Sequence, residues 1–287
     1  MDLGRLGAWY GADKLSPPQW IELVRTTERL GYGTQWYSES RQYEAMALGA
    51  FLLSHTSRIK LGTSIANIYA RDAVSSRNGL YTLGAISGGR FVLGLGVSHV
   101  PLVEGLRRHQ YGRPVATMRE YLRSMAGDAT DAGEWPVMLA ALGPRMLALS
   151  GEMTRGALPY NVTPEHTAQA REILGPGKWL AVEQKVCLET EPAKARALAR
   201  KELARYLTLP NYRRCWLSLG FTEAELDGGG SDRFLDAMVA WGTESAIRAR
   251  LAEHFDAGAD HVCIQPVHAD GDLEAAKRTL EVFAPGG

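Results

Sequence analysis

Short apolar runs alternate with longer amphipathic segments along most of the chain. The apolar runs have the length of β-strands, and the segments between them have the periodicity and the starting residues of α-helices. This alternation is typical of repeated strand–helix units around a parallel sheet. Eight strands are predicted, over Leu6–Tyr10, Thr34–Glu39, Ile59–Ala66, Phe91–Val97, Pro136–Leu142, Gly156–Tyr160, Leu180–Leu188 and Val262–Val267.

The segments between the predicted strands begin with good helix-starting residues. Ser16 precedes Pro17 and Pro18, Thr163 precedes Pro164, and Thr243 precedes Glu244. One helix-like segment, 72–89, joins the third and fourth strands, which predicts that these two strands are parallel neighbours with a right-handed crossover. Eight such units favour a (β/α)8 TIM barrel over an open doubly wound sheet, and we expect one domain over residues 1–287.

Two connections are longer than the strand–helix unit requires. Residues 99–112 follow the fourth strand, and residues 208–232 interrupt the seventh unit. Either segment has the length to fold over a ligand. A solvent-side excursion that helps assembly explains residues 208–232 equally well.

Composition excludes several classes of partner. Lys plus Arg and Asp plus Glu both number 32 in the 287 residues, so no excess of positive charge favours nucleic acid or a membrane surface. The start of the sequence lacks the pattern of a secretory signal, and no apolar run reaches the length of a membrane span. We therefore expect a cytoplasmic protein that acts on a small molecule. Cys187 and Cys263 fall within predicted strands, where a thiol serves as a small apolar side chain.

Three familiar site motifs are incomplete. Gly94 and Gly96 lack the third glycine of a dinucleotide-binding turn, because His99 stands in its place. Ser98 lacks the glycine two residues later that a nucleophile elbow needs, since residue 100 is Val. The seven histidines show no zinc-binding spacing, so no metal is expected.

Polar and small residues follow the predicted strands, where a TIM barrel carries its working face. Gly143 and Pro144 open a helix, a geometry that suits an anion, although an isolated Gly-Pro is more often an ordinary strand-to-helix turn. The candidate site residues at the strand ends are Glu39, Ser40, Arg41, Ser64, Ile65, Asn67, Ser98, His99, Ala140, Ala141, Leu142, Gly143, Tyr160 and His268.

Four segments resemble the luciferase-like monooxygenase superfamily, and within it the branch of oxidoreductases that use coenzyme F420. They are residues 36–40 (WYSES), 62–71 (GTSIANIYAR), 88–99 (GGRFVLGLGVSH) and 259–262 (ADHV). The resemblance implies a non-prolyl cis peptide at Ser64–Ile65 that supports the back of the deazaflavin ring. It further implies that Gly96, Val97, Ser98 and the stretch 140–143 approach the ribityl and phosphate parts of the cofactor, with Glu39, Ser64, Ile65 and Asn67 close to the ring.

The chain departs from the sugar-phosphate dehydrogenases of that branch. Ser40 and His99 stand where those enzymes have a histidine and a glutamate, and Leu158 to Asn161 replace the lysines that hold a sugar phosphate. A phosphorylated sugar is therefore disfavoured as substrate. His99 and Glu39 remain as the titratable pair, and a histidine with a near-neutral pKa is suited to proton transfer at a carbonyl or alcohol oxygen. The expected substrate pocket comprises Ser40, Arg41, Tyr160 and His268.

The resemblance thus implies an F420-dependent oxidoreductase that transfers a hydride between deazaflavin C5 and a small organic substrate. An FMN-dependent luciferase-like monooxygenase is the first alternative, and a catalytically silent flavin-binding barrel is the second.

A homodimer is expected from the second and third helices. The second, residues 44–53, has no charged residue between Glu44 and His55, and the third has only Arg77. Leu48 and Phe51 are predicted to lie on the outer face of this apolar patch, which a second copy would cover. The alternative is that residues 208–232 cover the patch.

Overall fold

Parallel strand pairing closes the sheet into a barrel in the computed structural model, which describes residues 1–286. The strands are β1 (Leu6–Tyr10), β2 (Thr34–Tyr37), β3 (Lys60–Thr63), β4 (Ala66–Asn67), β5 (Phe91–Gly96), β6 (Val137–Leu139), β7 (Gly156–Ala157), β8 (Trp179–Cys187), β9 (Val239–Trp241) and β10 (His261–Pro266). Each strand pairs in parallel with its neighbour, and β10 pairs with both β1 and β8. The chain is therefore a (β/α)8 barrel, as the alternation of strands and helices predicts.

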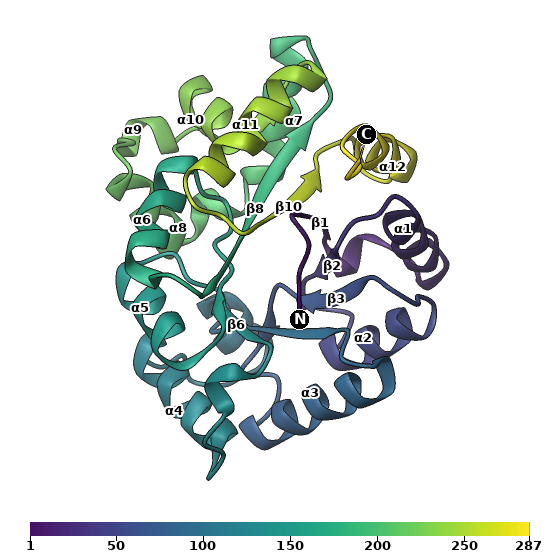
Figure 1. Ribbon diagram of the computed structural model, residues 1–287. Coiled ribbons are helices and arrows are strands. Elements are labelled where there is room, and N and C mark those ends of the chain that lie inside the picture. Colours follow the sequence, from purple (N-terminus) through teal and green to yellow (C-terminus); the bar gives the residue numbers. More distant parts are fainter. Residues whose placement is uncertain (287) are drawn as a thin grey trace.

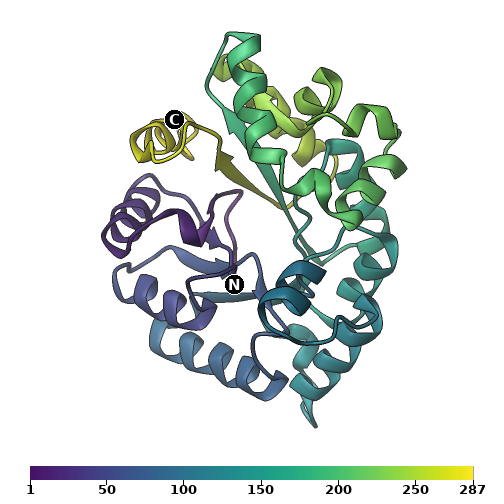
Figure 2. The same cartoon turned by 180° about the vertical axis from the view of Figure 1, so that it is seen from behind.

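Helices form the outer layer of the barrel (Figures 1 and 2). They are α1 (Pro17–Arg29), α2 (Ala45–Ser54), α3 (Ala73–Ser87), α4 (Pro114–Ala126), α5 (Pro144–Met153), α6 (Pro164–Leu174), α7 (Pro192–Leu203), α8 (Pro210–Ser218), α9 (Glu223–Leu226), α10 (Asp232–Met238), α11 (Glu244–Asp256) and α12 (Leu273–Val282). Short helical turns occur at η1 (Ala12–Lys14), η2 (Pro101–Leu106), η3 (Ala132–Glu134) and η4 (Tyr206–Thr208). No helix within residues 1–286 is both long and apolar enough to cross a membrane.

The observed elements correct the sequence prediction in three places. The third predicted strand is interrupted at Ser64 and Ile65, so that β3 pairs with β2 and β5 while β4 pairs with β5. Strands β6 and β7 are shorter than predicted, because the chain leaves the ladder soon after its few hydrogen-bonded residues. Strand β9 was not predicted, and it pairs with the last residues of β8.

The barrel interior is filled by large side chains from facing strands. Trp36 is fully buried there, and its indole N–H donates to Nε2 of His261 at 2.9 Å. A Cβ at Gly62 would lie 2.4 Å from the Trp36 ring, so the neighbouring strand has room for this indole only because residue 62 has no side chain. The remaining buried residues of this cluster are Leu3, Trp9, Val92, Met138, Leu158, Ala181 and Cys263.

A second apolar cluster lies within the long seventh unit. Trp216 and Phe234 pack edge to face at 4.8 Å, with Phe221 against Phe234 at 5.4 Å. The cluster also contains buried residues of α7, β9 and the loop after β10. Residues 208–232 are thus mostly helical and fold onto the barrel instead of extending away from it. Cys187 belongs to this cluster, and Cys187, Cys215 and Cys263 are all buried free thiols.

The buried histidine His261 makes stability dependent on pH. Its Nε2 accepts the Trp36 N–H, so its proton resides on Nδ1, which donates to the Gly4 carbonyl at 2.6 Å. A second proton on Nε2 would meet the indole N–H of Trp36, which is itself a donor. Burial lowers the pKa of His261 to about 4, although the bond to Gly4 partly opposes the shift. The unfolded chain therefore binds this proton more readily between pH 6.5 and 4.

We predict that the free energy of unfolding is highest above pH 6.5 and falls by about 2 kcal/mol between pH 7 and 5 through His261 alone. Urea unfolding at a series of pH values measures this. His261→Asn should reduce the fall by about 2 kcal/mol and leave the part due to His254 and His99, whose pKa values burial also lowers. Replacement of the exposed His109 by Asn should leave the dependence unchanged. A stability that rises on acidification would contradict the assignment.

Candidate active site

The carboxyl ends of the barrel strands meet at one face, and most of the predicted site residues lie there. They are neither fully buried nor fully exposed: Ser40, Ser64, Ile65, Val97, Ser98, His99, Ala140, Leu142, Tyr160 and His268. Gly143 and Arg41 are exposed, while Glu39, Asn67 and Ala141 are buried. Half-buried residues of small size, drawn from several strand ends, form a surface that a flat ligand can approach.

Strands β3 to β5 come unusually close at this face. The peptide bond between Ser64 and Ile65 is cis, as predicted. The Ile65 side chain lies against β5, where a Cβ on Gly96 would come within 2.5 Å of Ile65 Cγ1. A side chain at position 96 would displace that of Ile65, so the glycine lets the two strand ends pack in this way.

Glu39 is held in a dense set of donors. One carboxylate oxygen accepts the backbone N–H of Asn67 at 2.8 Å and the other that of Ala45 at 3.3 Å, and both also bind the Arg71 guanidinium. Arg71 pairs with Glu44 as well, at 2.5 Å. Burial alone would lower the pKa of Arg71, but the carboxylate partners raise it. No hydrogen bond joins Glu39 to His99 within residues 1–286, so the geometry favours a role for Glu39 in fixing the β3–β4 bend.

His99 lies under residues of the long seventh unit. Its ring is 5.9 Å from that of Tyr212 on α8. Burial lowers the pKa of His99 to about 4, the charge of Arg205 adds to the effect, and a hydrogen bond with Asn211 partly opposes it. The expectation of a near-neutral pKa is therefore wrong. At pH 7 the imidazole is neutral, and it is suited to accept a proton or a hydrogen bond.

The β6–α5 turn presents backbone near the site. Gly143 is the N-cap of α5, and a Cβ added there would have no atom within 4 Å, so the space beside it is open. The Leu142 carbonyl is hydrogen-bonded to Nε2 of His166 at 2.7 Å. This hydrogen bond fixes the β6–α5 turn. The first turn of α5 stays accessible to an anionic group.

Tyr160 lies at the centre of a polar and aromatic cluster that sequence reasoning only partly found. Its hydroxyl donates to Gln265 at 2.8 Å and is 3.0 Å from that of Tyr206. Its ring packs on Trp9 at 5.1 Å and lies 4.1 Å from the Lys185 ammonium. The rings of Trp9 and Tyr160 therefore line the site, and the buried ammonium group of Lys185 lies against the Tyr160 ring.

The buried ion pair of Lys185 and Glu183 was missed by the sequence analysis. The two groups are 3.2 Å apart, and the Lys185 side chain is fully buried. Burial lowers the pKa of Lys185 and raises that of Glu183, and each charge opposes the shift of the other. Two charged residues at alternate positions of a strand that is apolar apart from them and Gln184 were the available signal, because such positions share one face.

Residues 208–232 contribute directly to this face. Tyr212 packs against Tyr160 at 6.4 Å as well as against His99, and the Trp216 indole donates to the Asn161 carbonyl at 2.9 Å. The segment therefore covers the candidate site. The interpretation as a free solvent-side excursion is wrong, since Tyr212 and Trp216 are buried against the barrel.

The outer candidates occupy the rim. His268 Nε2 is 3.0 Å from the Tyr10 hydroxyl, and the two rings stack at 6.0 Å. The backbone N–H of Arg41 donates to Asp13 at 2.9 Å, while its side chain is exposed. Neither residue belongs to the cluster around Tyr160.

Comparison with known proteins agrees with this geometry. The family model of luciferase-like monooxygenases matches residues 1–130. A Methanolobus tindarius 5,10-methylenetetrahydromethanopterin reductase is 25% identical over 83% of this chain and 87% of its own length. The amino-terminal 130 residues thus match the luciferase-like monooxygenase family.

Two further proteins are similar to this chain. A Mycobacterium tuberculosis protein, named as a candidate coenzyme F420-dependent oxidoreductase, is 32% identical over 62% of the chain, which spans 60% of that relative's length. The coenzyme F420-dependent tetrahydromethanopterin reductase of Methanopyrus kandleri has the same fold, with a TM-score of 0.71 at 16% identity, over 99% of this chain and all of that one.

Substitution of Gly96 tests the close packing of β5 on Ile65. We predict that Gly96→Ala lowers the free energy of unfolding by roughly 1–3 kcal/mol, because the methyl group must displace a packed side chain. Denaturant unfolding measures the change. Gly143→Ala is the matched control and should alter stability little, since its methyl group meets no neighbour.

Proposed function

We propose that this protein is an oxidoreductase that binds coenzyme F420 and transfers a hydride between C5 of the deazaflavin and a small organic substrate. The observation that carries the proposal is the row of half-buried small residues at the ends of β3, β5 and β6, at the same end of the barrel as the cluster of Tyr160, Tyr212 and His99. The relatives named above support F420 as the cofactor. When bound, the deazaflavin supplies the hydride chemistry.

The residues present fit a ring with a ribityl phosphate chain. Gly96 and Ile65 form a close-packed wall for the ring, and the open space beside Gly143 suits a phosphate at the start of α5. Both side-chain amide atoms of Asn161 are buried without a hydrogen-bond partner within residues 1–286, and so is the indole nitrogen of Trp9. Buried polar atoms rarely stay unpaired in a working protein, so polar groups of bound molecules are the natural partners here.

The chain's own residues would orient the substrate and exclude water. Tyr160 and Tyr206 offer hydroxyl groups, and Tyr212 covers His99 from α8. The neutral imidazole of His99 is suited to take the proton of an alcohol as its carbon gives up a hydride. Lys185 is paired and fully buried, so it is not free to hold a substrate phosphate, in line with the expectation against sugar phosphates.

FMN is the alternative cofactor, because the family model that matches the chain describes monooxygenases. We predict that F420 binds with the lower dissociation constant. Titrating the protein with each cofactor, followed by absorbance and by quenching of tryptophan fluorescence, measures both constants. Tighter binding of FMN, with oxygen-dependent turnover, would replace the proposed function by the monooxygenase alternative, and binding without turnover would indicate a silent flavin-binding barrel.

Replacing His99 tests its role in proton transfer. We predict that His99→Gln lowers turnover by roughly a hundredfold while the dissociation constant of the cofactor changes by only a few fold. Because the pKa of His99 is about 4, the acidic limb of kcat/KM should lie near pH 4 and not near 6.5. His109→Gln on the surface is the control. Unchanged turnover in His99→Gln would reduce His99 to a packing residue.

We also propose a homodimer, with its contact surface corrected by the structure. Leu48 was predicted on the outer face of α2, yet it is 5% exposed and packs into the core between helices and sheet. Phe51 is half-buried, and Ile86 on the adjoining side of α3 is 65% exposed. No charged side chain lies between Glu44 and His55 to keep this surface hydrated.

We predict that the wild-type protein sediments as a dimer at micromolar concentration and that Phe51→Glu with Ile86→Glu yields monomers. Each buried carboxylate would lack a partner at the interface. Thr82→Glu, an exposed position on α3, is a milder control for added charge. A wild-type monomer over the same concentration range would contradict the dimer.

A further inference from the structure

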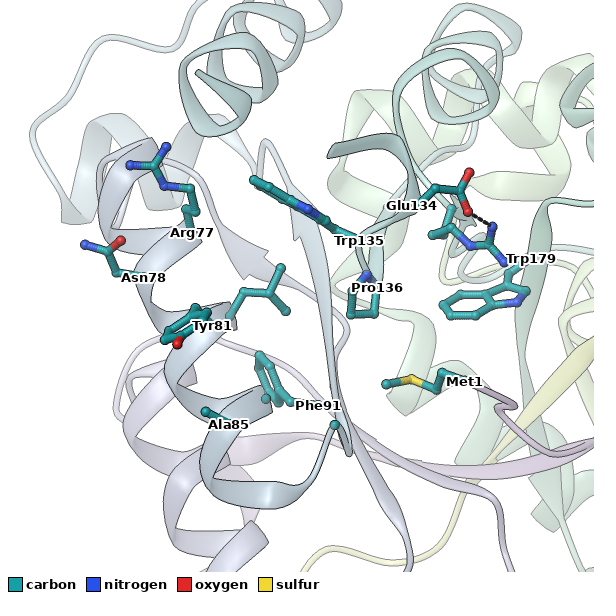
Figure 3. A pocket seen from close by; sticks show the side chains of 14 residues that line it. Met1, Arg77, Asn78, Tyr81, Ala85, Phe91, Glu134, Trp135, Pro136 and Trp179 are labelled. Carbon is teal, nitrogen blue, oxygen red and sulfur yellow. Dashed lines mark hydrogen bonds and ion pairs between the residues drawn. The ribbon is translucent and has the colours of Figure 1, made fainter. Parts of the chain in front are cut away.

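A large cavity opens at the opposite end of the barrel from the candidate active site. It has a volume of about 820 Å³ and lies between α3 and the segments that enter β5, β6, β7 and β8. Figure 3 shows Tyr81 and Phe91 on the α3 side, Trp179 and Met1 across from them, and Trp135 with Pro136 between. None of the candidate catalytic residues lines this space.

Part of the α3 wall of the cavity has almost no side chains. Gly84 and Ala85 form the α3 surface there, and Gly89 continues it before β5. A Cβ on Gly84 or on Gly89 would have no atom within 4 Å. Tyr81, one turn before Gly84, is 78% exposed and stands at the edge of this opening.

The opposite wall is aromatic and held in place. The Arg155 guanidinium lies 5.0 Å from the centre of the Trp179 ring, and it is fixed by an ion pair with Glu134 at 2.6 Å. The lining thus offers four aromatic rings from four separate segments of the chain, those of Tyr81, Phe91, Trp135 and Trp179. Sites for small molecules have volumes of roughly 300–1,000 Å³ and walls of this kind.

The charges at the rim indicate the sign of the ligand. Arg77 and Arg155 line the cavity against one carboxylate, that of Glu134. Arg155 is paired with Glu134, whereas Arg77 forms no ion pair with any of residues 1–286. The guanidinium of Arg77 lies at the edge of the cavity beside Gly127, and at that edge it favours a carboxylate, sulfonate or phosphate group.

We propose that this cavity is a second binding site that takes a ring-bearing small molecule with a single acidic group. The aromatic rings would stack on the ligand's ring system, the bare wall of Gly84 and Gly89 would admit it, and Arg77 would hold its anionic end. The N-terminal ends of barrel strands contribute to stability and not to catalysis, so the ligand would bind without reacting. Binding to the folded state alone raises the unfolding temperature.

The test uses 1-anilinonaphthalene-8-sulfonate, an aromatic monoanion whose fluorescence increases in an apolar site. N-phenyl-1-naphthylamine has the same rings without the sulfonate and reports on the charge. We expect one saturable site for each chain, with quenching of tryptophan fluorescence and a higher unfolding temperature. The same titration in the presence of saturating coenzyme F420 should give an unchanged dissociation constant, which separates this site from the candidate active site.

Two variants and one matched control assign the site. Gly84→Leu fills the cavity and improves helix propensity, so the protein should fold and bind both probes at least tenfold more weakly. Arg77→Gln should weaken binding of the sulfonate probe while that of the neutral probe stays unchanged. Thr82→Leu adds the same side chain to an exposed position of α3 outside the cavity and should have no effect.

Three results would overturn the proposal. One is the absence of saturable binding, and another is binding that Gly84→Leu does not weaken. The third is a change of oligomeric state in Gly84→Leu together with exclusion of both probes from the wild type, because a second copy of the chain would then occupy the cavity.

Discussion

The closed sheet can exist only if its interior is filled without a clash, and the indole of Trp36 is the largest group that must be accommodated. The indole fits because residue 62 on the next strand is a glycine without a side chain, and because His261 accepts the indole N–H. Residues from β2, β3 and β10 are thereby fixed relative to one another at the amino-terminal end of the barrel. The same steric constraint applies at the other end of the barrel, where the absence of a side chain at Gly96 leaves room for that of Ile65. Steric exclusion at these contacts sets the spacing of the strand ends.

The two ends of the barrel differ in what fills them. The carboxyl end is covered by side chains from the seventh unit, with Tyr212 over His99 and Trp216 bonded to Asn161. The amino end has no comparable cover beside α3, because Gly84 and Gly89 contribute none. The extra length of the seventh unit therefore lies at the face that carries the reactive groups. The absence of side chains at Gly84 and Gly89 leaves the other face open.

The sequence predicted the parts of the fold that depend on local pattern. Strand β1 coincides with its predicted range, and α3 begins after Asp72, whose side chain caps it. Strand β9 was missed because three residues between two helices carry no periodicity, and they become a strand only by pairing with β8. The contact of Tyr212 with His99 joins positions far apart in the chain, and no pattern near either residue indicates it. The pKa of His99 likewise depends on burial by those distant residues, which a sequence does not display.

The ion pair of Lys185 and Glu183 couples the substitutions that these two positions can tolerate. Either charge alone would remain buried and uncompensated, at a cost of roughly 3–5 kcal/mol, whereas an apolar pair of similar volume would be tolerated. A lineage can therefore leave this arrangement only by changing both residues within a short interval, or by passing through a protein that folds poorly. The two strand positions, separated by one residue, therefore tolerate substitution only as a pair.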